Sequence, residues 1–358
     1  MAKKKLKVGI IGTGGISGVH HSGYEKCDLS ELVAICDIKP EVLKEKGDKW
    51  DIPEERRFLD HKDLLKLDEI DAVSVCTPNK SHCEITVNAL KAGKHVLCEK
   101  PMAMNPAEAK KMNDAAEKAG KKLQIGLMHR YRPDAEFVKE LVDTGELGDI
   151  YYAQCKAVRR RGVPSWGVFG QLEEQGGGGT IDIGVHQIDL TWWLMGCPQP
   201  VSVSGATYQS IGNTPGHWGQ FGKWDHTTYT VEDFAAGFVR YENGATMSIE
   251  CSFCVNLDQD REGQHIVGTK GGAGLSPLSV QMEKGGHLMD CTPHHFVQTD
   301  LHGQPIKMRN HEKEVADFCR AVVEDDSVLV PGTQAIVTQK IIDGIFRSAK
   351  AGKEVKIS

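Results

Sequence analysis

The sequence predicts a two-domain α/β protein, with a doubly wound parallel sheet followed by an α+β domain built on a large, mostly antiparallel open-faced sheet. Its 358 residues are the length of two ordinary domains. The first third alternates short apolar runs with helix-like segments, which is typical of a parallel sheet. After about residue 145 the runs become longer and alternate polar with apolar residues, which indicates strands exposed on one face. The predicted domains span residues 1–127 and 128–358.

Short apolar runs predict the strands of the parallel sheet. Each is four or five residues long and rich in Val, Ile and Leu, as expected for strands buried on both faces. The predicted strands are 7–11, 32–36, 72–76, 95–98 and 123–127. Amphipathic stretches between them predict helices over 81–92 and 106–119. Gly93 and Gly120 follow these helices and suit left-handed caps, and Asn105 supplies an N-cap for the second helix.

The second domain is predicted to combine long strands with a few strong helices. The predicted strands are 150–158, 201–208, 234–241, 245–252 and 265–268. Asn243-Gly244 lies between two of them and is a hairpin-turn signal. Helices are predicted over 134–144, where the two domains are joined, and over 181–195, 312–324 and 333–350.

Composition excludes several classes of protein. Lys and Arg number 43 and Asp and Glu 49, so the formal charge of 43 − 49 = −6 argues against a nucleic-acid partner. No apolar run approaches the roughly 18 residues of a membrane span, and none after the basic N-terminus is long enough for a signal peptide. The 11 cysteines lack framework spacing and indicate reduced thiols. We therefore expect a cytoplasmic protein without a membrane partner and without a metal site.

A glycine-rich turn follows the first predicted strand. The turn Gly12-Thr13-Gly14-Gly15-Ile16-Ser17 has the G-x-G-x-x-small pattern that brings a pyrophosphate close to the backbone and to a helix N-terminus. Asp37 ends the second predicted strand, where a carboxylate binds ribose hydroxyls and repels a 2′-phosphate. The pattern predicts an NAD site at Gly12, Gly14, Gly15, Ile16 and Asp37, while the nearby Lys39 leaves NADP open.

Two polar segments follow neighbouring predicted strands. Thr77-Pro78-Asn79 and Glu99-Lys100-Pro101 both lie at strand carboxyl ends, the edge at which open α/β sheets bind ligands. A partly desolvated lysine beside a positively charged nicotinamide would have a lowered pKa. Lys100 is therefore a candidate acid–base group, whereas without such a setting it would be an ordinary loop lysine.

The predicted helix 181–195 carries the second set of candidate residues. It follows the glycine run Gly176–Gly179, and Asp182, His186 and Asp189 fall at i, i+4 and i+7 on one face. A carboxylate and an imidazole one turn apart suit alcohol oxidation, because the imidazole can accept the hydroxyl proton while the carboxylate orients it. The glycine run and the N-terminal glycine turn are expected to cradle substrate and cofactor.

Taken together, these segments resemble the Gfo/Idh/MocA oxidoreductases, the family of glucose–fructose oxidoreductase and inositol dehydrogenase. The resemblance covers nearly the whole chain. It implies that Lys100, Asp182 and His186 form the catalytic set. It also implies that Thr77, Asn79 and His82 lie near the nicotinamide end of the cofactor, with Glu99 beside its ribose. Arg130-Tyr131-x-Pro133 matches the family pattern and places Arg130 near the substrate. His129 stands where many members carry arginine and would contact substrate there.

One branch of the family is more similar than the rest. Arg161-Gly162-Val163-Pro164-x-Trp166-Gly167 and Trp192-Trp193-Leu194-Met195-Gly196 resemble the levoglucosan and glucoside dehydrogenases. In this interpretation Trp166 binds substrate, either by covering the nicotinamide or by stacking on a pyranose face. The alternative is an ordinary buried loop tryptophan.

The resemblance implies an NAD-dependent enzyme that oxidises a secondary hydroxyl of a sugar, glycoside or cyclitol. An NAD-dependent glycosidase would instead oxidise transiently and eliminate the glycosidic substituent with no net NADH. A third class is a cofactor-sensing regulator without enzymatic activity. The open sheet of the second domain is expected to form a homodimer or homotetramer, because an apolar sheet face should not stay in water.

Overall fold

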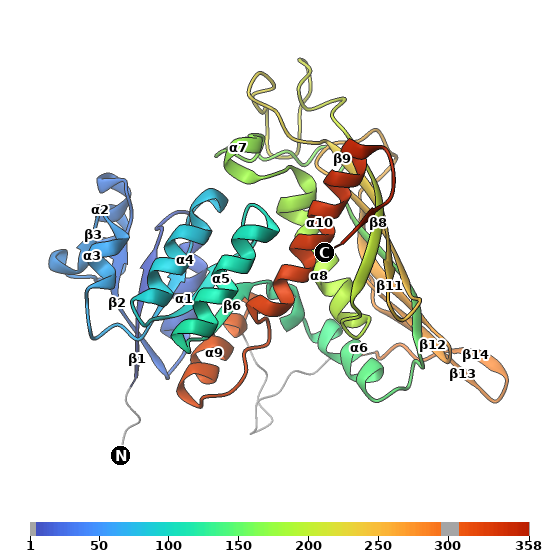
Figure 1. The fold of residues 1–358 in the computed structure, drawn as a ribbon, viewed down its shortest axis with the longest axis horizontal. Helices are drawn as coiled ribbons and strands as arrows, with labels where there is room; N and C mark the ends of the chain where they lie inside the picture. The colour runs from blue at the N-terminus through green and yellow to red at the C-terminus, as the bar shows by residue number, and fades with distance from the viewer. Residues whose placement is uncertain (1–4, 295–307, 358) are drawn as a thin grey trace. The chain divides into compact units, whose positions relative to one another are not determined.

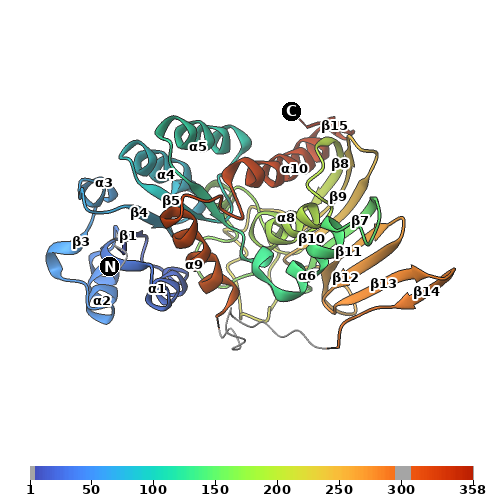
Figure 2. The same cartoon turned by 90° about the horizontal axis from the view of Figure 1, so that it is seen from below.

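A computed structural model describes residues 5–294 and 308–357. The chain forms two compact units (Figures 1 and 2). In the described part, unit 1 comprises residues 5–131 and 308–336, and unit 2 comprises residues 132–294 and 337–357. The predicted division after residue 127 is close to the first crossing of the chain. Residues 308–336 were predicted to belong to the second domain but belong to unit 1, because an amphipathic helix in this segment packs into the core of unit 1.

Unit 1 is built on a six-stranded parallel sheet, which confirms the predicted fold class. The strand order is β3-β2-β1-β4-β5-β6, so the direction of winding reverses between β1 and β4. Ligands bind such sheets at the carboxyl ends of the strands next to this reversal. The strands are β1 (Leu6–Ile11), β2 (Ser30–Cys36), β3 (Arg57–Phe58), β4 (Ala72–Val75), β5 (His95–Glu99) and β6 (Leu123–Gly126).

The helices of unit 1 connect these strands and begin and end where local sequence signals place them. The Asn105 Oδ1 accepts the Glu108 N–H at 3.0 Å, and Gly120 ends the same helix at φ +60°. The α-helices are α1 (Ser17–Lys26), α2 (Pro40–Lys49), α3 (His61–Leu65), α4 (His82–Lys91) and α5 (Pro106–Ala119). Short 3-10 turns lie at η1 (Glu54–Arg56), η2 (Asn79–Ser81) and η3 (Met128–Tyr131).

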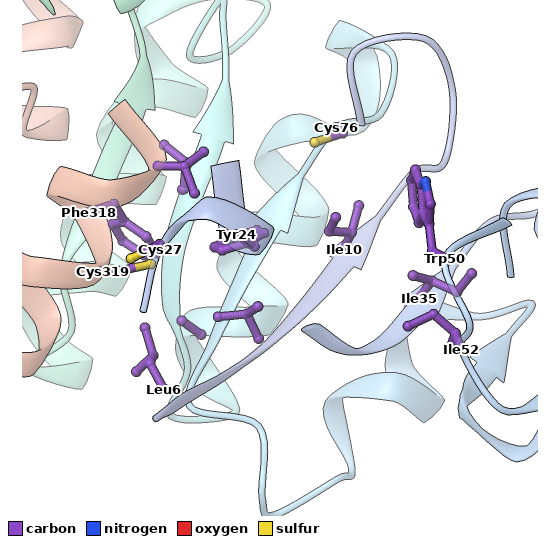
Figure 3. Close-up of a cluster of buried hydrophobic side chains, with 14 of the residues drawn as sticks. Leu6, Ile10, Tyr24, Cys27, Ile35, Trp50, Ile52, Cys76, Phe318 and Cys319 are labelled. Atoms are coloured by element: carbon purple, nitrogen blue, oxygen red, sulfur yellow. The ribbon is translucent and has the colours of Figure 1, made fainter. Parts of the chain in front are cut away.

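The core of unit 1 includes a helix from the far end of the sequence. Helix α9 (Asn310–Val323) buries Val315, Phe318 and Cys319 completely, and they join Leu6 and Tyr24 in one apolar cluster (Figure 3). Burying such side chains contributes about 1.5–3 kcal/mol each. This apolar face explains why the chain returns to unit 1.

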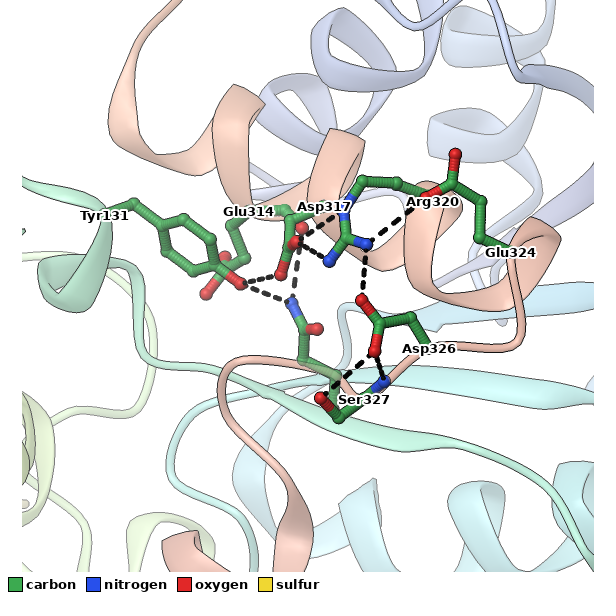
Figure 4. Close-up of polar contacts among 8 residues, drawn as sticks. Tyr131, Glu314, Asp317, Arg320, Glu324, Asp326 and Ser327 are labelled. Atoms are coloured by element: carbon green, nitrogen blue, oxygen red, sulfur yellow. Dashed lines mark hydrogen bonds and ion pairs between the residues drawn. The ribbon is translucent and has the colours of Figure 1, made fainter.

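Polar contacts also hold α9 in place (Figure 4). The Tyr131 hydroxyl donates to Asp317 at 2.9 Å, next to the point where the chain leaves unit 1. Arg320 donates to Asp317 at 2.9 Å and to Asp326 at 2.8 Å, and it also reaches Glu324. The return of the chain is therefore fixed by hydrogen bonds as well as by packing.

Unit 2 is built on a nine-stranded sheet of order β14-β13-β12-β11-β7-β10-β9-β8-β15. All neighbouring pairs are antiparallel except β10 with β7, which are parallel. The strands are β7 (Ile150–Val158), β8 (Pro200–Tyr208), β9 (Phe234–Tyr241), β10 (Thr246–Ser252), β11 (Arg261–Gly268), β12 (Gly271–Leu275), β13 (Ser279–Lys284), β14 (His287–Asp290) and β15 (Val355–Lys356).

Helices cover one face of this sheet (Figure 2). Helix α8 contacts β7 and β11, and α6 packs beside α8. Buried Ala153, Cys155 and Ala157 on β7 face this layer, while the positions between them are only half-buried. The helices are α6 (Pro133–Asp143), α7 (Leu172–Gln175), α8 (Val185–Leu194) and α10 (Gly332–Ala351), which starts in unit 1 and continues into unit 2.

Candidate functional site

The glycine turn between β1 and α1 combines one tight contact with open space. Gly12 has φ +88°, and a Cβ there would lie 2.6 Å from the Cys76 carbonyl oxygen. At Gly14 and Gly15 a Cβ would meet no atom within 4 Å. The hydroxyl of buried Ser17 donates to the Gly14 carbonyl at 2.6 Å, which explains why Ser17 is tolerated in place of a third glycine. No side chain caps the first turn of α1 at Ile16. The turn thus has room for a phosphate group beside the helix start.

Asp37 lies next to this turn at the end of β2. Its Oδ2 accepts the Thr13 N–H at 2.7 Å and the Thr13 hydroxyl at 3.0 Å, and its Oδ1 accepts the Lys39 N–H at 2.9 Å. Each carboxylate oxygen has two lone pairs. Thr13 uses both of those on Oδ2, whereas Oδ1 keeps one that can accept a ribose hydroxyl. Ile38, which had no predicted role, is 83% exposed beside it and offers an apolar surface suited to an adenine ring. These residues fit a bound dinucleotide.

His82 joins the two strand-end loops that carry Asn79 and Lys100. Its ring is completely buried, with Nδ1 2.7 Å from the Pro101 carbonyl oxygen and Nε2 2.8 Å from that of Thr77. Burial alone would lower the pKa of His82, but Cys98 and the two carbonyls outweigh it and raise the pKa to about 9. Only a protonated ring can donate to both carbonyls. Any effect of His82 on the predicted cofactor site would therefore act through these loops.

Glu99 is buried directly before Lys100, and its carboxylate has partners within unit 1. Its Oε1 lies 2.8 Å from His20 Nε2, and its Oε2 accepts the Lys100 N–H at 3.1 Å. His20 Nδ1 lies 2.9 Å from the Ser74 hydroxyl. Burial raises the pKa of Glu99, but the His20 hydrogen bond and the charges of His20, Lys100 and His311 outweigh it and hold the pKa below its usual value. The contact between His20 and Glu99 was not predicted, because the two residues are 79 positions apart in the sequence and only the folded structure brings them together.

In unit 2, Asp182 and His186 lie in a short exposed window of an otherwise buried helical segment. Along residues 180–194 only Asp182, Ile183 and His186 are partly exposed. The segment begins with a π-helical turn, η4 (Thr180–Gly184), rather than with the predicted α-helix. Asp189 is completely buried and accepts the Thr338 hydroxyl at 3.4 Å. Asp189 lies one turn beyond His186 in α8 and bonds to Thr338 of α10, so the predicted three-residue face presents only two residues.

The glycine run before this segment packs closely against the sheet. A Cβ on Gly178 would lie 2.4 Å from the Glu232 carbonyl oxygen, and one on Gly179 would lie 2.8 Å from the Phe253 backbone nitrogen. A Cβ on Gly184 would lie 2.6 Å from Cys251 Sγ. These contacts show that the glycines allow a close approach to neighbouring chain segments. They differ from Gly14 and Gly15, which face open space.

The predicted substrate residues have different surroundings. Arg130 is completely buried in unit 1 and donates to the Leu329 carbonyl oxygen at 3.2 Å and to Gln334, which favours a structural role. His129 is half-buried. Trp166 is 55% exposed and packs edge-on against Phe169 and Phe221, with ring centroids 6.3 and 5.1 Å away. The alternative of an ordinary buried tryptophan is therefore wrong, while the substrate contacts stay predictions.

The predicted catalytic set is shared between the units. Lys100 belongs to unit 1, and Asp182 and His186 belong to unit 2, so their joint role stays a prediction. Among residues 5–294 and 308–357 there is no group of three or more His, Cys, Asp or Glu side chains that could hold a metal ion. In the same part of the chain, no helix is both long enough and apolar enough to cross a membrane.

Comparisons with known proteins agree with this architecture. Residues 6–127 match the model of the Gfo/Idh/MocA oxidoreductase family, NAD-binding Rossmann fold, and residues 139–357 match the C-terminal α/β domain of that family. The chain is 36% identical to the D-glucoside 3-dehydrogenase of Escherichia coli (strain K12) over 100% of this chain and 99% of the relative. It is 31% identical to an inositol 2-dehydrogenase of Salmonella typhimurium (strain LT2) over 53% of this chain and 54% of that one.

A solved structure of levoglucosan dehydrogenase in complex with NADH is also similar. It aligns with a TM-score of 0.85 and 23% identity, over 99% of this chain and 100% of that chain, and so shares the fold. The family models together span nearly the whole chain, and the glucoside dehydrogenase relative matches it from end to end. The chain therefore belongs to the Gfo/Idh/MocA oxidoreductase family, as an NAD(P)-dependent dehydrogenase whose first unit is an NAD-binding Rossmann domain.

Proposed function

We propose that this enzyme oxidises a secondary hydroxyl of a glycoside or related sugar and transfers the hydride to NAD. The observation that carries the proposal is the exposed window at Asp182 and His186. A carboxylate and an imidazole are the partly exposed polar groups of a helix whose other polar side chains are buried. Such a pair suits the removal of a proton from an alcohol.

The cofactor residues follow from the geometry of unit 1. Gly14 and Gly15 leave space for the pyrophosphate, and the start of α1 at Ile16 offers backbone N–H groups to it. Asp37 accepts a ribose hydroxyl through Oδ1 and repels a 2′-phosphate, so NAD is preferred over NADP. Bound NAD supplies the hydride acceptor. Thr77, Asn79 and Glu99 complete the nicotinamide end of the site, and His82 supports it.

The chain's own side chains handle the proton. His186 and Lys100 accept the hydroxyl proton in turn, and Asp182 orients the substrate and the His186 ring. His129 and Trp166 are the proposed substrate contacts outside this set, while Arg130, predicted beside them, would act from its buried position as a support. Of these, exposed Trp166 is best suited to stack on a sugar ring.

The relatives support glycosides as the first substrate class to test. One relative that matches over the full length is named D-glucoside 3-dehydrogenase, whereas the inositol 2-dehydrogenase match covers about half of the chain. We therefore propose a glucoside as substrate, with its 3-hydroxyl as the first candidate position. Cyclitols are the second candidate class.

The test is a substrate panel with both cofactors. Glucosides, levoglucosan, inositols and acidic sugars are incubated with NAD or NADP, and NADH and the released aglycone are measured together. Net NADH with an intact glycosidic bond supports the dehydrogenase, and the position of the new ketone is read by NMR. Released aglycone without NADH would show a glycosidase that oxidises transiently. Cofactor binding with neither product over the whole panel would favour a sensor.

The sheet of unit 2 offers a surface for self-association. On β9, Ala235 and Val239 are buried, whereas Phe238 between them is only half-buried and faces the side opposite the helices. An apolar side chain on an uncovered sheet face favours a partner sheet. We propose a cytoplasmic homodimer or homotetramer formed through this face. Light scattering coupled to size-exclusion chromatography tests the assembly, and F238E should weaken it.

A further inference from the structure

A buried carboxylate holds the start of the helical segment that presents Asp182 and His186. Glu232 is 9% exposed and lies two residues before the start of β9 (Phe234–Tyr241). Its Oε2 accepts the Gly178 N–H at 2.8 Å, and its Oε1 accepts the Thr180 N–H at 3.1 Å. The two oxygens of one side chain thus bind two backbone groups on either side of Gly179, at the entrance to η4.

The backbone of Gly178 connects Glu232 to Asp182. The Gly178 carbonyl oxygen accepts the Asp182 N–H at 3.0 Å, while the Gly178 N–H is bound by Glu232. Gly178 also packs so tightly that a Cβ would lie 2.4 Å from the Glu232 carbonyl oxygen. That carbonyl in turn accepts the Tyr229 hydroxyl at 3.2 Å. Glu232 is therefore two hydrogen bonds from the backbone of Asp182, in a place with no spare volume.

The charge of Glu232 also suits this position. Backbone N–H groups at the start of a helix carry a partial positive charge, which stabilises an anion there. Burial raises the pKa of Glu232, and the N–H groups of Gly178 and Thr180 oppose that shift by binding the carboxylate. The next residue, Asp233, turns to other partners and accepts the N–H groups of Ile211 and Gly212 at 2.6 and 2.8 Å. The Glu232 carboxylate, by contrast, binds the glycine run at Gly178 and the first residue of η4, Thr180.

We propose that Glu232 is a positioning residue, whose two-pronged hydrogen bond fixes the first turn of the segment so that Asp182 and His186 meet the substrate in a reactive geometry. The inference rests on the proposed role of these two residues. It adds a requirement that the sequence pattern does not reveal, because Glu232 lies 38 residues after the end of α8 and outside every motif. A misplacement of about 1 Å in a catalytic group can reduce the rate about 100-fold.

The experiment compares E232Q and E232D with a matched control on the full-length enzyme. In E232Q an amide NH₂ replaces one acceptor and faces a backbone N–H, so one hydrogen bond is lost. In E232D the charge is kept but withdrawn by one methylene. E242Q is the control, since Glu242 is exposed and follows the other end of β9. For each variant, kcat and KM for methyl glucoside, the pH profile of kcat, the Kd of NAD and the melting curve are measured.

We expect E232Q to lower kcat by about tenfold or more and to shift the pH profile of kcat. The Kd of NAD should change less than about twofold, because the cofactor residues are in unit 1. E232D should fall between E232Q and the wild type, and it decides the question if E232Q does not fold. Wild-type kcat and pH profile in the folded variants would overturn the inference, whatever the melting temperature. H186A, assayed in parallel, separates the two hypotheses: if it too keeps its kcat, the proposed function has failed rather than the role of Glu232.

Discussion

His20 Nε2 and Glu99 Oε1 lie 2.8 Å apart in the interior of unit 1, with 0% and 7% of their side chains exposed. The contact joins α1, which follows the glycine turn, to the end of β5, which precedes Lys100. It therefore links the part of the chain that we propose to bind the pyrophosphate to the part that carries a candidate catalytic group. A buried carboxylate of this kind stabilises the fold only while its partner is in place.

The first prediction concerns the pH dependence of this contact. The pKa of Glu99 in the folded protein is below its usual value of 4.5, so its contribution to stability is present above that pH and is lost as the pH falls through the lowered value. E99Q should lower the free energy of unfolding by about 1–3 kcal/mol at neutral pH. Urea unfolding of both proteins should show this difference shrinking below pH 4.5. A difference that is constant with pH, or equal to that of the exposed control E84Q, would contradict it.

The second prediction concerns Lys100. K100A should lower kcat by about 100-fold or more, because it removes an acid–base group from the reacting hydroxyl. The affinity for NAD should be roughly kept, since the glycine turn and Asp37 are untouched. Steady-state kinetics and a fluorescence titration with NAD measure the two quantities. K91A, at an exposed lysine at the end of α4, serves as the control. Normal turnover by K100A would show that the catalytic assignment is wrong.

The third prediction concerns the choice of cofactor at Asp37. The wild-type kcat/KM for NAD should exceed that for NADP by about tenfold or more, because the carboxylate repels a 2′-phosphate. D37S should reduce this ratio and also weaken NAD binding. The carboxylate accepts the Thr13 and Lys39 N–H groups as well, so circular dichroism must confirm that the variant folds. A wild-type enzyme that prefers NADP tenfold would overturn the role given to Asp37.

The fourth prediction separates two glycines of the same turn. G12A should destabilise unit 1 by about 2 kcal/mol or more, since Gly12 has φ +88° and its added Cβ would lie 2.6 Å from Cys76 O. G15A should leave the melting curve nearly unchanged and weaken NAD binding, because its Cβ enters the open space assigned to the cofactor. Thermal melting and NAD titration of both variants provide the comparison. The reverse pattern would show that the space at Gly15 is not used by NAD.

Local signals were sufficient for much of the fold. Helix α5 occupies the predicted residues because Asn105 caps one end and Gly120 adopts a left-handed conformation at the other. Strands β7 and β9 also match their predicted bounds, because half-buried strands alternate visibly in sequence. The strands β12 to β14 were not predicted. The first begins with two glycines and the last is exposed throughout, so neither has the apolar pattern of a strand.

In the candidate site, too, local sequence signals predicted some residues, whereas contacts between distant parts of the chain could not be predicted. Lys100 and the glycine turn could be placed from the ends of predicted strands. The burial of Asp189 could not, because its partner Thr338 lies 149 residues further along the chain. His20, Ile38 and Glu232 were also missed. His20 and Glu232 form contacts with residues far away in the sequence. Ile38 is an apolar residue that would be expected in the core, and only the folded structure shows that it is exposed.

The return of α9 to unit 1 has a consequence for the order of events during synthesis. Val315, Phe318 and Cys319 complete the core around Leu6 and Tyr24, yet a ribosome makes them only after every strand from β7 to β14 has been synthesised. Part of the apolar surface of unit 1 therefore stays uncovered until most of unit 2 has been translated. A nascent chain halted before residue 310 should bind chaperones at this uncovered surface, and the release of α9 from the exit tunnel should end that binding.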